Sequence, residues 1–164
     1  MGADKGSVAF RSARHEDAAL LVQLYNASFR ADYLRYGQCP GYGRTLQQME
    51  KSIARYPKQI LLYHEKPVGV LSARELADDV VSLGCLCVIP EYQGKGIGTL
   101  AMEQLERMYP NWKRIELITP ADKTENIRFY TRRCGFVLAG EEMDGKVRVV
   151  KLVKNQINEQ VREY

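Results

Sequence analysis

The sequence predicts a mixed α/β fold, built as one domain over residues 1–164 from about seven strands and about four helices. Segments with strand and helix patterns follow one another along the whole chain, in the order β-α-α-β-β-β-α-β-α-β-β. A chain of this length with 45% hydrophobic residues can bury most of its apolar surface around one core. We expect residues from about 155 to 164 to form a C-terminal tail.

The first strand is expected at residues 8–11 and the first helix at residues 17–29. One side of this amphipathic helix is predicted to pack in the core, and at helical spacing it carries Leu20, Leu21, Leu24, Tyr25 and Ser28.

Residues 30–43 are expected to form a loop, because they combine three tyrosines, three glycines and a proline. Loops on a rigid scaffold often carry binding residues. This loop is therefore a candidate lip for a substrate, with the side chains of Asp32, Tyr33, Tyr36 and Tyr42. Alternatively, the tyrosine rings cover the core, and the sequence does not decide between the two.

A second helix is predicted at residues 45–56, since Thr45 and Gln48 match a capping box. Two β-rich runs, residues 60–64 and 68–73, predict a hairpin that turns at residues 65–67.

The centre of the chain is an apolar strand, Val80–Val88, followed by a glycine-rich turn that opens a helix at residues 99–108. The first turn of a helix presents unpaired N–H groups and the positive end of the helix dipole, which suits an anion. Gly94, Gly96 and Gly98 leave no Cβ between such a ligand and the main chain. The spacing fits neither the P-loop nor the dinucleotide fingerprint.

The C-terminal third adds a strand, a helix and a hairpin. Residues 114–119 alternate as a strand, and Asp122 with Glu125 predicts the cap of a helix that ends at Gly135. Asp144-Gly145 predicts a hairpin between the last two strands, residues 136–143 and 146–154.

Two motifs resemble the signatures of the GNAT superfamily of N-acetyltransferases. Residues 93–98 read Q-x-x-G-x-G after a strand that ends L-x-V-x-P, and residues 126–136 read NIRFYTRRCGF. The resemblance covers about residues 8–153 and matches the order of elements. It implies a GNAT-type mixed, mostly antiparallel central sheet of about seven strands, flanked by about four helices.

The resemblance implies transfer of an acetyl group from acetyl-CoA to a primary amine by direct attack in a ternary complex, without a metal. A small-molecule acceptor is favoured over a protein. Asn126 would contact the cosubstrate, Phe129 would line its channel, and Tyr130 would donate a proton or hydrogen bond to the leaving sulfur. The other residues implied for cosubstrate binding are Leu86, Cys87, Val88, Gln93, Gly94, Lys95, Gly96, Ile97, Gly98 and Thr99.

The general base is left open, because Val80–Val88 carries no carboxylate where many GNAT relatives have a glutamate. The candidates are a water relay or one of Asp32, His64, Glu75 and Asp79. Cys87 or Cys134 as an acyl-carrying nucleophile is a weaker alternative. A function of another class, a non-catalytic acyl-CoA-binding or sensing module, also fits the glycine-rich turn.

The composition indicates which partners and which cellular location to expect. The formal charge is +4, but 24 basic residues against 20 acidic ones are too balanced to indicate nucleic acid as a partner. Four scattered cysteines and two histidines lack the spacing of a zinc site and suggest a reducing, cytoplasmic location. No run has the length of a membrane span. The C-terminal strands could also pair between two chains and so form a homodimer.

Overall fold

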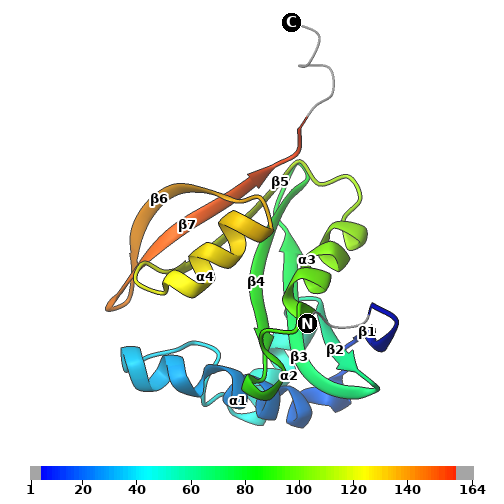
Figure 1. Ribbon diagram of the computed structural model, residues 1–164. Helices are drawn as coiled ribbons and strands as arrows, with labels where there is room; N and C mark the ends of the chain where they lie inside the picture. Colours follow the sequence, from blue (N-terminus) through cyan, green and yellow to red (C-terminus); the bar gives the residue numbers. More distant parts are fainter. Residues whose placement is uncertain (1–4, 158–164) are drawn as a thin grey trace, which may run out of the picture. The chain divides into compact units, whose positions relative to one another are not determined.

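The computed structural model describes residues 5–157, which form a seven-stranded sheet in the order β1-β2-β3-β4-β5-β7-β6 together with helices (Figure 1). The strands are β1 (Val8–Ser12), β2 (Lys58–Tyr63), β3 (Lys66–Glu75), β4 (Val80–Val88), β5 (Arg114–Pro120), β6 (Val137–Asp144) and β7 (Val147–Asn155). The α-helices of the described residues are α1 (Ala18–Tyr36), α2 (Leu46–Arg55), α3 (Ile97–Met108) and α4 (Thr124–Arg128).

The pairing of the strands confirms the predicted mixed, mostly antiparallel sheet. β4 and β5 run parallel, whereas β1 with β2, β2 with β3, β5 with β7 and β6 with β7 are antiparallel. Residues 158–164, most of the expected tail, lie outside the described residues.

The described chain divides into two compact units. The first holds the residues up to Arg74 together with Gly84–Leu105, and the second holds Glu75–Leu83 together with the residues from Glu106 onward. β4 and α3 each contribute residues to both units. The expectation of a single domain over residues 1–164 stays a prediction.

The core of the first unit lies between its helices and strands. Leu21 and Tyr25 of α1, Met49 of α2, Ile60 of β2 and Val70 of β3 belong to one buried cluster. The apolar stripe expected in the first helix is therefore confirmed as core. The capping box at the start of α2 is also confirmed: the Thr45 hydroxyl accepts from the Gln48 amide, and the Gln48 side chain accepts from the Thr45 amide.

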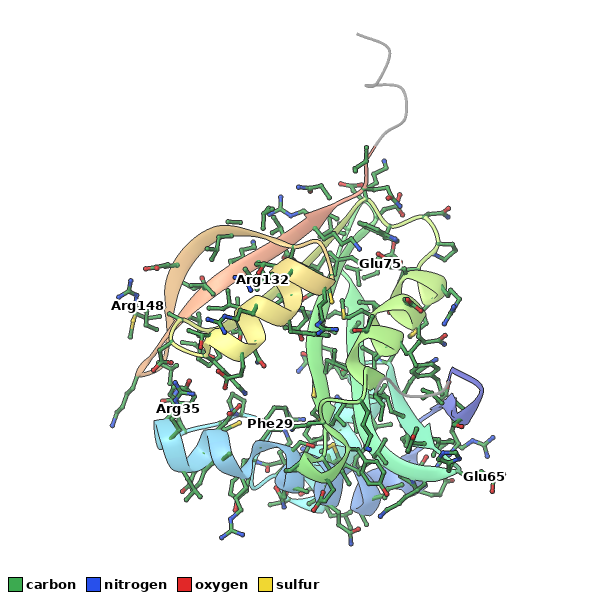
Figure 2. All side chains as sticks on the ribbon, viewed as in Figure 1. Phe29, Arg35, Glu65, Glu75, Arg132 and Arg148 are labelled. Atoms are coloured by element: carbon green, nitrogen blue, oxygen red, sulfur yellow. The ribbon has the colours of Figure 1, made fainter. Side chains whose placement is uncertain are left out.

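The first helix is longer than predicted, so the expected loop is wrong for residues 30–36. α1 continues to Tyr36 and ends at Gly37, which is left-handed with φ 71° and donates its N–H to the Tyr33 carbonyl. Figure 2 shows Arg35 at this end of α1. The segment before Gly37 contains good helix formers and no glycine or proline, so nothing in it stops the helix.

The β2–β3 turn also differs from the prediction. It is made by His64 and Glu65, both with positive φ, whereas Pro67 lies inside β3 opposite Leu62 at an irregularity in the ladder. Proline is tolerated at such a position because a ladder hydrogen bond is already missing there.

In the second unit, β5 pairs with β7, and β7 pairs with β6. The last hairpin is confirmed, with Gly145 in the left-handed region at φ 61°. The helix predicted from Asp122 begins at Thr124 after an N-cap at Lys123, so the expected Asp122 cap is wrong. It then widens into a π-helix, Phe129–Arg133, labelled η4.

β6 is the last strand in the sheet order, and all its residues are exposed, Val137, Leu138 and Met143 among them. Pairing of these C-terminal strands between two chains, as a homodimer, stays a prediction. Among the residues that the structure describes, no helix has both the length and the apolar character needed to cross a membrane.

Candidate functional site

The turn after β4 is tied to the strand that precedes it. Its 3-10 turn, Pro90–Tyr92, leads into Gln93, whose side-chain Nε2 donates to the Val88 carbonyl at 2.8 Å. The Ile89 N–H donates to the Val68 carbonyl of β3, also at 2.8 Å. These bonds fix where the chain leaves the sheet and enters α3.

The glycines of this turn adopt the backbone conformations that glycine favours. Gly94 has φ 75° and Gly96 has φ 82°, and a Cβ at Gly94 would meet no atom within 4 Å. α3 begins at Ile97, two residues earlier than predicted, and the Leu100 N–H reaches back to the Gly96 carbonyl at 3.3 Å. The amides before Leu100 therefore precede the helical ladder and have no acceptor within the helix.

This arrangement fits a diphosphate. The bare main chain at Gly94 opens onto free space, and the N-terminus of a twelve-residue helix follows directly. A phosphate there would accept from amides and lie at the positive end of the helix dipole. Lys95 is half-buried in the same turn and adds a positive charge.

The end of β4 supplies the other first-unit residues expected to bind a cosubstrate. Cys87 is buried, while Leu86 and Val88 are half-buried. The parallel pairing of β4 with β5 covers Val80–Ser82, so Leu86, Cys87 and Val88 follow that paired segment along the strand.

The second unit holds Asn126, Phe129 and Tyr130. Asn126 lies in α4 and donates from Nδ2 to the Thr119 hydroxyl at 3.3 Å. Tyr130 lies in η4 and is 7% exposed, and its ring packs edge-on against Phe129 and Phe136 at centroid distances of 5.0 and 5.6 Å. π-helical turns occur often at functional sites. No sequence signal indicated this one.

The expected lip is partly helical. Asp32, Tyr33 and Tyr36 lie on the last turns of α1, and Tyr42 follows in the loop. The rings of Tyr33 and Tyr42 stack at 4.6 Å with an interplanar angle of 16°, and Tyr33 remains 42% exposed. The stacked pair therefore presents an aromatic surface to solvent.

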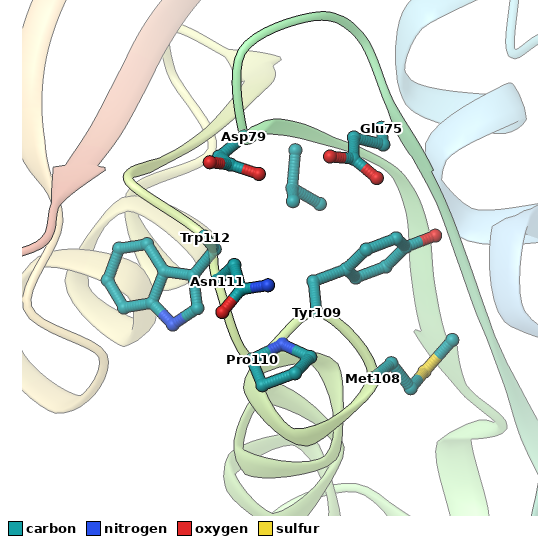
Figure 3. Close-up of a pocket in the computed structure, with 8 residues that line it drawn as sticks. Glu75, Asp79, Met108, Tyr109, Pro110, Asn111 and Trp112 are labelled. Carbon is teal, nitrogen blue, oxygen red and sulfur yellow. The ribbon is translucent and has the colours of Figure 1, made fainter.

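The base candidates divide between the two units. Asp32 and His64 belong to the first, where the His64 ring packs edge-on against Tyr63 at 4.5 Å. Glu75 and Asp79 belong to the second and line one cavity of about 120 Å³ with Tyr109 and Trp112 among its walls (Figure 3).

Charged groups in and beside the cavity affect one another. Burial and the Glu75 charge raise the pKa of Tyr109. Asp79 lies 4.0 Å from the Lys113 ammonium. The cavity therefore holds two carboxylates and a phenol, and one of the carboxylates, Asp79, has a cationic neighbour.

The two cysteines considered as nucleophiles are poorly suited to that role. The pKa of Cys87 is raised by its hydrogen bond to Cys85 and by burial, and burial raises the pKa of Cys134 to about 11. Both thiols are therefore held protonated near neutral pH. The part of the chain that the structure describes contains no group of three or more His, Cys, Asp or Glu side chains that could hold a metal ion.

Sequence reasoning missed a buried polar group in the first unit. Lys58 is only 6% exposed and donates from Nζ to the Tyr25 hydroxyl at 3.1 Å and to the Ser72 hydroxyl at 3.0 Å. Burial lowers the pKa of Lys58 to about 8. Three separate elements bring these residues together, so no local pattern could have indicated the contact.

The model of the acetyltransferase (GNAT) family matches residues 20–136 of this chain. Several solved structures share the fold. An acetyltransferase from Thermus thermophilus has a TM-score of 0.76 at 18% identity, covering 92% of this chain and 97% of that one. The PaiA N-acetyltransferase of Thermoplasma acidophilum, in complex with coenzyme A, has a TM-score of 0.75 at 18% identity, with 92% and 99% covered.

Two further comparisons are one similarity in structure and one in sequence. The spermidine N-acetyltransferase of Vibrio cholerae, in complex with CoA and spermine, has a TM-score of 0.73 at 18% identity, covering 93% of this chain and 97% of that one. In sequence, the chain is 42% identical over 55 residues to the uncharacterized protein YrkN of Bacillus subtilis (strain 168), a match that covers 34% of this chain and 30% of that protein's length.

Proposed function

Because the chain belongs to the GNAT family of acetyltransferases, we propose that it transfers the acetyl group of acetyl-CoA to a primary amine. The transfer occurs by direct attack in a ternary complex. The observation that carries the proposal is the bare main chain at Gly94 and Gly96, followed at once by the N-terminus of α3. That combination suits the diphosphate of a coenzyme A derivative.

The first unit would hold most of the cosubstrate. Amides from Gln93 to Thr99 receive the diphosphate, with Lys95 adding charge. The main chain of Leu86, Cys87 and Val88 pairs with the amide-bearing arm that leads to the thioester. The Val88 carbonyl also accepts from Gln93, and the second lone pair of its oxygen is left for such a contact.

Asn126, Phe129 and Tyr130 would have the roles that the family resemblance implies for them. Asn126 contacts the cosubstrate and Phe129 lines its path. Bound acetyl-CoA supplies the activated acetyl group, and the CoA sulfur leaves as negative charge develops on it. Tyr130 donates a hydrogen bond or a proton to that sulfur, a role that suits a phenol because phenols in general are weak acids.

For the acceptor, we propose a small amine rather than a protein. The stacked Tyr33 and Tyr42 with Asp32 nearby on α1 would attract a cation, since aromatic faces and carboxylates both favour ammonium groups. The structural neighbours include both kinds of enzyme: one acts on spermidine, and another modifies the N-terminal serine of a ribosomal protein.

Two measurements test the proposal. Calorimetry should detect binding of acetyl-CoA and CoA to the purified protein. Incubation with acetyl-CoA and an amine panel, comprising a polyamine, an amino acid amide, a lysine peptide and a free peptide N-terminus, should release free thiol with at least one small amine.

The outcomes separate the alternatives. Binding without thiol release across the panel would favour a sensing module. Release only with the peptides would make a protein the acceptor. If neither acetyl-CoA nor CoA binds, the proposed function is wrong.

A further inference from the structure

The cavity of the second unit is lined by acidic, aromatic and apolar side chains, and none of its wall residues is basic. All of these residues belong to the second unit, and the cavity has a volume of about 120 Å³. Glu75 at the end of β3 and Asp79 before β4 supply two carboxylates. Tyr109 and Trp112, which follow α3, supply two aromatic rings. Carboxylates and aromatic rings both attract cations, so this wall favours a positively charged ligand.

The two carboxylates face the same space. Figure 3 shows those of Glu75 and Asp79 on one side of the cavity, turned toward each other, with the Tyr109 ring and the Asn111 amide opposite them. Two negative charges that share a space repel each other, so a cation between them is attracted by both. Among the residues that the structure describes, Glu75 has no cationic partner. Burial, and after it the charge of Glu75, raises the pKa of Tyr109, so the phenol is close enough to interact with that carboxylate.

Main-chain hydrogen bonds hold Asp79 at this wall. Asp78 and Asp79 have φ of 54° and 63°, in the turn that joins β3 to β4. The Leu76 N–H closes this turn on the Val80 carbonyl at 2.7 Å. The Asp79 carbonyl accepts from the Lys113 N–H at 2.8 Å, which ties the turn to the segment after α3. The two sides of the cavity are therefore joined by the main chain, so the site is formed without a ligand.

The ion pair of Asp79 with Lys113 leaves the cavity open. The Lys113 Nζ lies 4.0 Å from Asp79 Oδ2, which is long for an ion pair, and the Lys113 side chain is largely exposed. Ion pairs of this kind at a surface contribute little free energy. Lys113 is also not one of the wall residues of the cavity. The contact shows that an ammonium group can approach this carboxylate.

An alkylammonium ion fits the walls better than a divalent metal ion. Ca²⁺ takes about six to eight oxygen ligands, but Val81, Met108, Pro110 and Trp112 offer no side-chain oxygen to the cavity. An ammonium group donates hydrogen bonds to carboxylates, while the methylene groups behind it can pack on apolar side chains. Both kinds of wall are then used.

We propose that this cavity binds a primary alkylammonium group, held by the carboxylates of Glu75 and Asp79 beside the Tyr109 ring. The site lies in the second unit, whereas the residues proposed for the acceptor amine lie in the first, so it is a second amine site. It assigns Glu75 and Asp79 to binding rather than to catalysis. A free alkylamine and the side chain of a lysine in a peptide share this chemistry.

Trp112 allows a direct test, because the single tryptophan of the chain is a wall residue of the cavity. Propylammonium chloride, titrated at constant ionic strength, should change the Trp112 fluorescence until it reaches a plateau. Propanol, which lacks the charge, and propionate, which has the opposite charge, should not. Calorimetry of the same titration measures binding without relying on the ring. A wild-type protein that shows neither a fluorescence plateau nor saturable heat would overturn the proposal.

Three variants locate the binding. Glu75→Gln and Asp79→Asn each remove one charge and keep the shape of the side chain, and asparagine tolerates the positive φ of Asp79. Each should raise the dissociation constant of propylammonium about 5-fold or more. Asp78→Asn is the matched control: it makes the same charge change at the next residue, which also has positive φ but does not line the cavity. Its dissociation constant should stay within about 2-fold of wild type, and a loss equal to that of Asp79→Asn contradicts the site.

A titration with Nα-acetyl-lysine methylamide distinguishes the two sources of the ammonium group. Binding at least about 5-fold tighter than that of propylammonium supports a lysine side chain as the ligand, and equal or weaker binding supports a free amine. These titrations contain no acetyl-CoA. The proposed acetyl transfer can therefore fail while the amine site is confirmed, and the reverse can also occur.

Discussion

Tyr130 combines a polar group with an apolar setting. Its ring is enclosed by Phe129 and Phe136, and the Phe136 N–H donates to the Tyr130 carbonyl at 3.0 Å, so both the ring and the main chain are held. A phenol fixed in this way loses little freedom when it donates to a leaving sulfur. The hydroxyl, rather than the ring, should carry the effect on turnover.

We therefore expect Tyr130→Phe to lower kcat about 10²-fold while the calorimetric affinity for acetyl-CoA stays within about 2-fold. The substitution keeps the ring and its packing. Tyr109→Phe removes a phenol from the cavity of the second unit and should leave kcat unchanged. Equal turnover of wild type and Tyr130→Phe would show that Tyr130 has a packing role only.

Lys58 makes the stability of the protein depend on pH in a defined direction. Its pKa is about 8 in the folded chain against an ordinary value of 10.5, so between these values the unfolded chain binds more protons. The free energy of unfolding contributed by this site therefore rises as the pH increases from about 8 to 10.5. The lowered pKa of Cys85 acts in the same direction, whereas the raised pKa values of Tyr25, Cys87 and Cys134 oppose it at alkaline pH.

A comparison with Lys58→Met isolates this contribution. Urea unfolding at pH 7.5 and pH 9.5 should show wild type gaining stability relative to the variant as the pH rises, by on the order of 2 kcal/mol. The difference between the two proteins cancels most groups that titrate in both. If the difference in unfolding free energy between wild type and Lys58→Met stays constant with pH, the pKa of Lys58 is not lowered in the folded protein.

The strands β3 and β4 approach each other closely at Gly69. A Cβ on Gly69 would collide with the Cys87 carbonyl oxygen and lie 3.2 Å from the Val88 Cα, both main-chain atoms that cannot rotate away. Gly69→Ala should therefore destabilise the protein by about 1–3 kcal/mol, as overpacking does. Gly84→Ala is the matched control, since its Cβ would sit at an ordinary 3.6 Å from the Ser72 carbonyl. Equal stability of both variants in urea would refute the close approach.

The role of the turn before α3 in binding acetyl-CoA can be tested separately from its effect on stability. Gly96→Ala places a Cβ at φ 82°, and Gly145→Ala does the same at φ 61° in the β6–β7 hairpin, so both should lose roughly 1 kcal/mol of stability. Only Gly96→Ala should also weaken acetyl-CoA binding, by about 10-fold or more in calorimetry. Equal acetyl-CoA affinities of the two variants would show that this turn does not bind the diphosphate.

The sequence predicted those elements whose signals are local. The Thr45–Gln48 capping box and the strand–glycine turn–helix junction each lie within a few residues, and both are confirmed as structure. The predicted end of α1 is too early, because the tyrosines, glycines and proline of residues 30–43 indicate a loop for the whole segment, although only Gly37 stops the helix. The contact of Lys58 with Tyr25 joins residues 33 positions apart, and it depends on tertiary packing that no local pattern encodes.

At the scale of the whole chain, three elements belong to both compact units: β3, whose last residue Glu75 lies in the second unit, β4 and α3. Val80–Leu83 of β4 lies in the second unit and the rest of that strand in the first, while α3 passes from the first to the second after Leu105. Melting either unit would remove part of a strand and part of a helix from the other. Since such elements form cooperatively, we expect one unfolding transition.

Trp112, the single tryptophan, provides a direct measurement because it is buried in the second unit. Its fluorescence and the far-ultraviolet circular dichroism of the whole chain should change with the same midpoint on heating. The Gly69→Ala change lies in the first unit, yet it should lower the Trp112 midpoint by about 2–4 °C for each kcal/mol lost. A Trp112 transition unmoved by Gly69→Ala would mean that the units unfold independently and that the chain is two domains.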